Sequence, residues 1–205
     1  IITAQDVVEA VDDEMGEDYA KLAGLTAEED LQETTKQSIK KRLPWLVVLL
    51  VLGMGVSAVV GAFENVVAIL PIVICFQSLI LDMAGNVGTQ SLAVTIRVLM
   101  DEELAPKDKL KLVLKEAKVG FSNGFLLGIL AIVFLGLYIF LYKGYDIRHA
   151  FLISLCVGVS LLLAMIVSSL VGTLVPLFFK KIKVDPAVAS GPLITTVNDL
   201  VAVVI

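Results

Sequence analysis

The sequence predicts an all-α membrane protein, and three observations carry that prediction. Hydrophobic residues make up 58% of the 205 residues and the mean hydropathy is +0.91, whereas soluble domains contain about 45–50% apolar residues. The charges are uneven, because residues 1–42 hold 11 of the 21 acidic residues and long uncharged runs follow Pro44. The net charge of −5 offers no basic surface to nucleic acid, so no nucleic-acid partner is expected.

Five apolar runs are each long enough to cross a bilayer, which takes about 17–25 residues. The second run would extend about 50 Å as one helix, so it must tilt, kink at Pro71 or project beyond the bilayer. The second and fifth runs each contain one acidic residue, and the other three contain no charge. The five predicted spans are residues 45–63, 65–96, 119–142, 150–179 and 186–205.

The basic residues predict how these spans are oriented. Twelve basic residues flank the spans on the side of the N-terminus, and only Lys143 and Arg148 lie on the other side. Cytoplasmic loops are enriched in Lys and Arg, so we expect a cytoplasmic N-terminus and an outward C-terminus. Because the chain begins at Ile1 and not at Met, we expect it to be part of a longer protein. The twelve are Lys40, Lys41, Arg42, Arg97, Lys107, Lys109, Lys111, Lys115, Lys118, Lys180, Lys181 and Lys183.

The segments outside the spans are predicted to be helical. We expect one helix over residues 4–23 and a second, polar one over residues 27–43 that begins at a capping box, Thr26 to Glu29, and leads directly into the first span at Pro44. A third, over residues 109–118, has an apolar face opposite its lysines, which is typical of a helix at the membrane surface. A helix in a solvated loop is the alternative.

Two acidic residues within the predicted spans, Asp82 and Asp199, are candidate functional residues. A charged residue at the centre of a spanning helix costs about 2.5–3.5 kcal/mol or more, and both lie among oxygen donors without His or Cys. Such ligands suit a hard cation such as Mg²⁺, Ca²⁺ or Mn²⁺. The alternatives are polar contacts that hold helices together and, for Asp82, a place near the cytoplasmic mouth or a basic partner. The donors are Asn86, Thr89, Gln90 and Ser91 around Asp82, and Thr195, Thr196 and Asn198 around Asp199.

The N-terminal segment carries a dense acidic face. Glu14, Glu17 and Asp18 lie at i, i+3 and i+4, and Glu9 lies nearer to the N-terminal end of the same helix. Like charges at this spacing repel, and a bound cation would relieve the repulsion. An ordinary solvated acidic helix is the alternative.

These motifs resemble the MgtE family of magnesium channels, over essentially all 205 residues. The most specific parts are residues 85–91, Gly-Asn-Val-Gly-Thr-Gln-Ser, and the segment from Asp185 to Asp199; residues 115–120 also fit. The resemblance implies a homodimer with five spans per subunit and a pore on the two-fold axis, lined by the second and fifth spans. It further implies that Asp199 from both subunits takes a hydrated Mg²⁺, beside Asn86 and the backbone of Thr195.

The resemblance also implies a domain organisation. Residues 1–25 correspond to the end of a cytoplasmic CBS region, residues 26–43 to a connecting plug helix and residues 44–205 to the pore domain. In the family, Mg²⁺ bound between these parts holds the channel closed. One departure is Gly191, where some relatives have Asn, which leaves gating at that point open. The implied regulatory ligands are Glu9, Glu14, Glu17, Asp18 and Asp185.

The expected function is therefore a Mg²⁺-selective channel and not an enzyme. It would import Mg²⁺ across the cell membrane, with Mn²⁺, Co²⁺ and Ca²⁺ as further candidate cations, and cytoplasmic Mg²⁺ would close it. One rival is a secondary transporter that couples cation movement to protons or sodium, with Asp82 as the coupling site. The other is an intramembrane aspartyl protease, which the absence of a Gly-x-Gly-Asp signature disfavours.

Overall fold

The computed structural model describes residues 2–23, 25, 33–63, 71–101, 104–188 and 191–205. Every regular element within these ranges is helical. Four helices, α2, α4, α5 and α6, are long and apolar enough to cross a membrane, and α7 is a shorter apolar helix. The prediction of an all-α membrane protein is thus confirmed at this level. The elements are α1 (Ala4–Leu22), α2 (Thr35–Ala62), α4 (Pro71–Asp101), α5 (Pro106–Lys143), α6 (Ile147–Lys181), the 3₁₀ helix η1 (Pro186–Val188) and α7 (Gly191–Val204).

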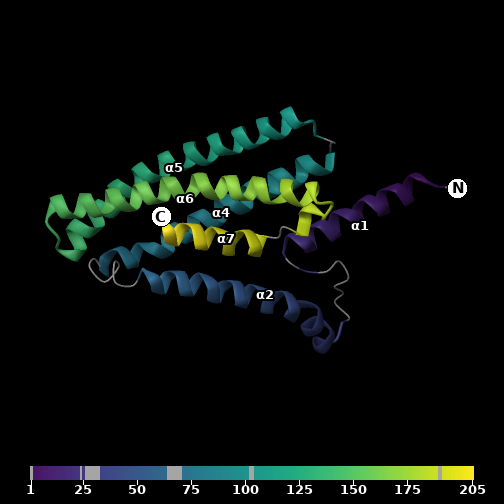
Figure 1. The fold of residues 1–205 in the computed structure, drawn as a ribbon, viewed down its shortest axis with the longest axis horizontal. Helices are drawn as coiled ribbons and strands as arrows, with labels where there is room; N and C mark the ends of the chain where they lie inside the picture. The colour runs from purple at the N-terminus through teal and green to yellow at the C-terminus, as the bar shows by residue number, and fades with distance from the viewer. Residues whose placement is uncertain (1, 24, 26–32, 64–70, 102–103, 189–190) are drawn as a thin grey trace.

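The long helices form an elongated bundle around α6 (Figure 1). The helices α5, α4 and α7 all pack on α6, and α2 lies on the far side of α7. Successive helices run in alternating directions, so the starts of α2, α5 and α7 gather with the ends of α4 and α6 at the end of the bundle where α1 projects. This alternation agrees with the predicted order of spans. The number of spans and the cytoplasmic side remain predictions, and α7 alone, at about 21 Å, is shorter than the hydrocarbon layer of about 30 Å.

The first two helices start at capping boxes. In α1 the Thr3 N–H donates to Asp6 Oδ2 at 2.7 Å and the Asp6 N–H to Thr3 Oγ1 at 3.3 Å, and the helix covers the predicted range to within a residue. The polar helix predicted over residues 27–43, leading directly into the first span at Pro44, begins later than expected. Thr34 is not helical, and its N–H donates at 3.0 Å to the side chain of Gln37, which caps a helix starting at Thr35.

The predicted plug segment and the first apolar run are one helix, α2, which continues through Pro44. The proposed cap at Thr26 and the residues up to 32 lie outside the described residues. Proline in a helix interior removes one backbone hydrogen bond and commonly kinks or breaks the helix, yet α2 is continuous on both sides of Pro44. None of the 28 residues of α2 is buried.

The amphipathic segment at residues 109–118 is not a separate surface helix, as predicted, but the first part of α5. Pro106 occupies the first turn, and the helix ends only at Gly144, whose φ of 71° is the left-handed conformation that glycine adopts easily. Nothing between these residues breaks the backbone pattern. The glycines inside α5 serve packing instead, since a Cβ at Gly128 would lie 3.0 Å from the carbonyl oxygen of Gly158 on α6.

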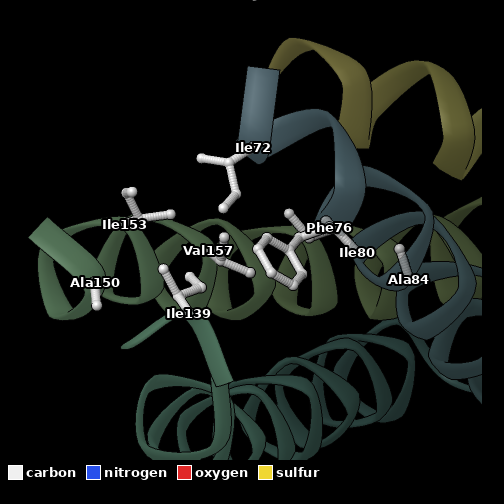
Figure 2. Close-up of a cluster of buried hydrophobic side chains, with 9 residues drawn as sticks. Ile72, Phe76, Ile80, Ala84, Ile139, Ala150, Ile153 and Val157 are labelled. Carbon is white, nitrogen blue, oxygen red and sulfur yellow. The ribbon is translucent and has the colours of Figure 1, made fainter. Parts of the chain in front are cut away.

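The largest buried cluster joins three helices at the end of the bundle distant from α1. Side chains of α4 point between those of α5 and α6 (Figure 2). Further along the bundle, towards α1, the backbones of α4 and α6 approach closely, because a Cβ at Gly172 of α6 would lie 2.2 Å from the carbonyl oxygen of Gly88 on α4. Small residues commonly allow such contact between membrane helices. The cluster comprises Ile72, Phe76, Ile80, Ala84, Ile139, Ala150, Ile153, Val157 and Ala164.

Candidate cation site

The short helix α7 has two different faces. Gly191, Ile194 and Asn198 are buried, following the i, i+3 and i+7 spacing of one helix face. Asn198 is fixed in this position, since its Nδ2 donates to the carbonyl oxygen of Ala84 on α4 at 3.5 Å. Thr195 and Asp199 each follow a buried position by one residue and are partly exposed, so they lie at the edge of this buried surface.

Two glycines of α4 allow α7 to approach closely. A Cβ on Gly88 would lie 2.1 Å from Nδ2 of Asn198, which no side chain could tolerate without moving. A Cβ on Gly85 would lie 3.3 Å from Cγ2 of Thr195. The Gly-x-x-Gly spacing thus places the polar residues of α4 directly beside those of α7.

A cavity of about 290 Å³ lies between α4 and α7. Its walls include two carboxylates, one amide and three hydroxyl groups, all of which are oxygen donors. No basic residue, His or Cys lies among the described lining residues. They are Ser78, Leu81, Asp82, Gly85, Asn86, Thr89, Thr195 and Asp199.

Local hydrogen bonds leave oxygen lone pairs free in this cavity. Asn86 donates its Nδ2 to the carbonyl oxygen of Asp82 at 2.9 Å, so its amide oxygen is not used by that bond. The hydroxyl of Thr195 donates to Gly191 O at 3.0 Å, and that of Thr89 donates to Gly85 O at 2.9 Å. With their protons committed to their own helices, both hydroxyl groups can act only as acceptors towards a cation or its water.

The two carboxylates have no basic partner within the described part of the chain. Two acids without a counter-ion favour a cation between them, because unpaired negative charge in a low-dielectric layer is costly. The donor set suits Mg²⁺, which prefers oxygen and keeps several of its waters. Six waters occupy roughly 180 Å³ at about 30 Å³ each, so the cavity has room for a hydrated ion.

The structure brings together the three residues predicted for the pore, Asp199, Asn86 and Thr195, and adds Asp82 to them. Ser78 escaped the sequence analysis, although its i, i+4, i+8 spacing with Asp82 and Asn86 was a signal that could have found it. Other polar residues named with the site lie outside its lining. Thr196 donates to Pro192 O, and Ser91 donates to the buried carboxylate of Glu116 on α5.

The predicted regulatory acids are only partly brought together. Lys21 Nζ lies 2.8 Å from Glu17 Oε1 and 2.6 Å from Asp185 Oδ2, so it joins α1 to the segment before α7. Glu9 accepts a hydrogen bond from Gln5, and Glu14 is exposed. The side chain of Asp18 lies outside the described residues. Among the residues that the structure describes, no three acidic, His or Cys side chains form a group that could hold a metal ion.

Lys21 is the feature of this region that the sequence analysis did not foresee. Partial burial works to raise the pKa of Asp185, but the hydrogen bonds from Lys21 and from the Ala187 N–H outweigh it and lower that pKa below its ordinary value. The hydrogen bonds to Asp185 and Glu17 in turn raise the pKa of Lys21. The bridge is therefore fully charged at neutral pH.

Known proteins resemble this chain in sequence, including the segments that line the cavity. A family model described as MgtE, divalent cation transporter, matches residues 77–205, which include all the α4 residues that line the cavity and all of α7. Three relatives named magnesium transporter MgtE align over the whole chain. They come from Enterococcus faecalis at 37% identity, Bacillus subtilis at 35% and Thermus thermophilus at 32%.

The chain spans 43% of the length of the Enterococcus faecalis relative and 44% of each of the other two. The matched family is a family of transporters and not of enzymes. The four long apolar helices of the chain, together with these relatives, make the chain a multi-pass protein of the cell membrane. The apolar bundle, the acidic cavity beside α7 and these alignments lead to one conclusion: the chain belongs to the MgtE family of divalent cation transporters.

Proposed function

We propose that the chain is the pore-forming part of a channel that imports Mg²⁺ across the cell membrane as a homodimer. The observation that carries the proposal is the α4–α7 cavity, where Asp199, Asp82 and Asn86 present oxygen atoms without a basic partner in the described chain. A cavity open on one side suits a site completed by a second copy on a two-fold axis. Residues 44–205 would form this pore domain, with Mg²⁺ as its cargo and other divalent cations as weaker competitors.

Selection for Mg²⁺ would rest on its water shell. Asp199 and the acceptor oxygens of Asn86 and Thr195 would bind the waters of the ion instead of replacing them. Mg²⁺ loses water reluctantly and demands near-octahedral geometry, so a site that binds the hydrated ion avoids the free-energy cost of removing its waters. Larger ions shed water more readily, so they would gain less from a site of this kind.

The test of this proposal uses cobalt(III) hexammine, whose ligands do not exchange and which resembles hydrated Mg²⁺. Mg²⁺ uptake into liposomes containing the protein should fall with added cobalt hexammine, in competition with Mg²⁺. If cobalt hexammine neither binds nor blocks while Mg²⁺ uptake proceeds, the hydrated-ion site is refuted.

Regulation by cytoplasmic Mg²⁺ is the second part of the proposal. Residues 1–25 would belong to a regulatory region and residues 26–43 to a plug helix, with Mg²⁺ bridging the acidic face of α1 to Asp185. Support comes from the short distance between these acids, since Lys21 contacts both Glu17 of α1 and Asp185 before α7, and Mg²⁺ would take its place. A bound ion shifts the balance of open and closed states only by its differential affinity for them. Neutralising Glu14 and Glu17 should therefore weaken closure by Mg²⁺ and spare uptake.

A coupled transporter is the alternative function, and the position of Asp82 favours it. Asp82 lies in the same cavity as Asp199, where a carboxylate could exchange a proton or bind sodium as Mg²⁺ moves. Uptake would then depend on a proton or sodium gradient. Mg²⁺ current that persists when both gradients are removed would exclude coupling and leave the channel.

A further inference from the structure

The surface of α5 has a second hollow, of about 510 Å³, that is separate from the cation cavity. All of its described lining residues come from α5, over three turns near the start of that helix. These turns lie at the end of the bundle where α1 projects (Figure 1). The lining residues are Lys111, Leu114, Lys115, Lys118, Val119, Ser122 and Asn123.

The charge of this hollow is uniformly positive. Three lysines line it, and no acidic residue is among its described lining residues. Lys111 is paired with Asp108 at 2.9 Å, on the exposed surface. Lys115 and Lys118 form no ion pair or side-chain hydrogen bond within the described chain.

The nearest acid on the same turn of the helix does not neutralise these lysines. Glu116 is 5% exposed and points into the bundle, where it accepts a hydrogen bond from Ser91 Oγ at 3.0 Å. Its main-chain oxygen accepts from Ser169 Oγ at 2.7 Å. The basic face and the buried acid therefore lie on different sides of α5.

The hollow also straddles the change from charged to apolar surface. Val119 begins 24 residues without charge, and exposed aromatic rings follow at once. Phe121 and Phe125 are each about half exposed and stack with their ring centres 6.1 Å apart. Ser122 and Asn123 lie one turn below Lys118, about 6–8 Å along the helix axis. Along α5, the lysines are thus followed by the hydrogen-bonding side chains of Ser122 and Asn123 and by the exposed rings of Phe121 and Phe125.

We propose that this hollow binds the headgroup of an anionic phospholipid. Lys115 and Lys118 would contact the phosphodiester, Ser122 and Asn123 would hydrogen-bond the glycerol or carbonyl groups, and the acyl chains would lie along Phe121 and Phe125. Basic residues next to a membrane span attract anionic lipid by about 1 kcal/mol each, or roughly fivefold in affinity. A free anion would gain nothing from the exposed rings of Phe121 and Phe125. A phospholipid has both a charged headgroup and acyl chains, so it fits the whole surface. This inference stands apart from the proposed cation pathway.

The test compares Lys115→Gln/Lys118→Gln with Lys143→Gln, which removes a lysine from the opposite end of the same helix. Binding of phosphatidylglycerol to the purified protein is titrated in detergent by native mass spectrometry. Parallel titrations use phosphatidylcholine, which has the phosphodiester but no net charge, and glycerol 3-phosphate, which has no acyl chains. Thermal unfolding of each variant verifies that it is folded.

The expected result is one phosphatidylglycerol molecule per chain that binds the double variant about 25-fold more weakly than the unsubstituted protein, which is the product of two fivefold factors. Lys143→Gln should bind it normally, and phosphatidylcholine should bind weakly to all forms. Equal binding of phosphatidylglycerol by both variants would overturn the proposal. Binding of glycerol 3-phosphate as tight as that of the lipid would also overturn it, in favour of a site for soluble anions. If the double variant fails to fold, Lys115→Arg/Lys118→Arg must retain lipid binding, and its loss there would refute the site.

Discussion

The interface between α5 and α6 and the interface between α4 and α7 are built from similar small residues but do opposite things. Between α5 and α6, Gly120, Gly124 and Gly128 bring the helices into direct contact along the buried face of α5. Between α4 and α7, Gly85 and Gly88 also allow close approach, yet a cavity with two carboxylates lies beside the contact. The presence of glycines alone therefore does not distinguish an interface that only packs two helices together from an interface that contains a functional site.

The difference lies in how the polar groups of each interface are satisfied. The hydroxyl of Ser169 donates to Glu116 O, and Ser91 donates to the carboxylate of Glu116, so the polar atoms at the α5 seam are paired. In the cavity, Asp82 and Asp199 have no such partner in the described chain. Asp82 is exposed and Asp199 is only partly buried, so neither carboxylate is tied into the packing of the helices, and unpaired negative charge within an apolar layer favours a bound cation.

The largest expected effect comes from a third contact, between α4 and α6, which brings these two interfaces together in one bundle. Gly172→Ala places a Cβ where the carbonyl oxygen of Gly88 now lies 2.2 Å away, so α4 and α6 must separate. Such overpacking typically costs about 1–3 kcal/mol or more. We expect a lower Tm and loss of Mg²⁺ uptake together. Gly53→Ala is the control, since a Cβ there meets nothing within 4 Å and should leave both unchanged.

A smaller effect is expected from Asp82→Asn. The substitution keeps the size of the side chain and removes one of two carboxylates from the cavity, so cation attraction weakens without being lost. Mg²⁺ uptake should fall several-fold, with Tm unchanged and no new dependence on a proton gradient. Abolished proton dependence in the variant, where the unsubstituted protein shows it, would instead identify Asp82 as a coupling site.

The smallest effect is expected at the bridge between α1 and Asp185. Its groups are partly exposed, and such ion pairs contribute about 0–1 kcal/mol, so Lys21→Met should loosen α1 without affecting the Tm of the bundle. Spin labels on α1 and α6, in a variant lacking Cys75 and Cys156, would report a broader distance distribution. A distribution as narrow as that of the unsubstituted protein would show that other contacts hold α1.

The same bridge predicts a pH dependence. Because the pKa of Asp185 is lowered, its contribution is present above the ordinary carboxyl pKa of 3.8 and is lost as the pH falls through the lower value in the folded protein. Because the pKa of Lys21 is raised, the contact survives at alkaline pH until the pH passes that higher value. The α1–α6 distance should therefore be constant around neutral pH and broaden only in strong acid or strong base. Broadening between pH 6 and 8 would contradict this.

Much of the fold was readable from the sequence because apolar runs and caps are local signals. The spans at residues 119–142 and 150–179 lie within α5 and α6, and α1 ends within a residue of its prediction. One junction was predicted wrongly: residues 109–118 looked like a helix lying at the membrane surface, but they form the first part of α5, whose buried positions Leu112, Glu116 and Gly120 run through this segment. At Pro44 the polar segment and the first span form one helix, as expected, but its start at Thr35 was not foreseen.

Three of the residues that line the cavity were named from residue type and family resemblance, and the cavity itself and the rest of its lining required the fold. Asp199, Asn86 and Thr195 are unusual residues within apolar runs and could be found by inspection. That Asp82 shares their cavity depends on how α7 is rotated, which Asn198 and Gly88 set through contacts across more than a hundred residues. The pairing of Lys21 with Asp185, 164 residues away, had no local signal for the same reason.

The central claim is that Asp199 acts in ion permeation and not in holding the bundle together. The most direct test is Asp199→Asn, with Asp108→Asn as a control that removes the same charge from the exposed start of α5. Mg²⁺ uptake into liposomes and Tm in detergent are measured for both. The account predicts that Asp199→Asn loses Mg²⁺ uptake at an unchanged Tm while Asp108→Asn keeps both; normal uptake by Asp199→Asn, or a collapse of its Tm, would contradict it.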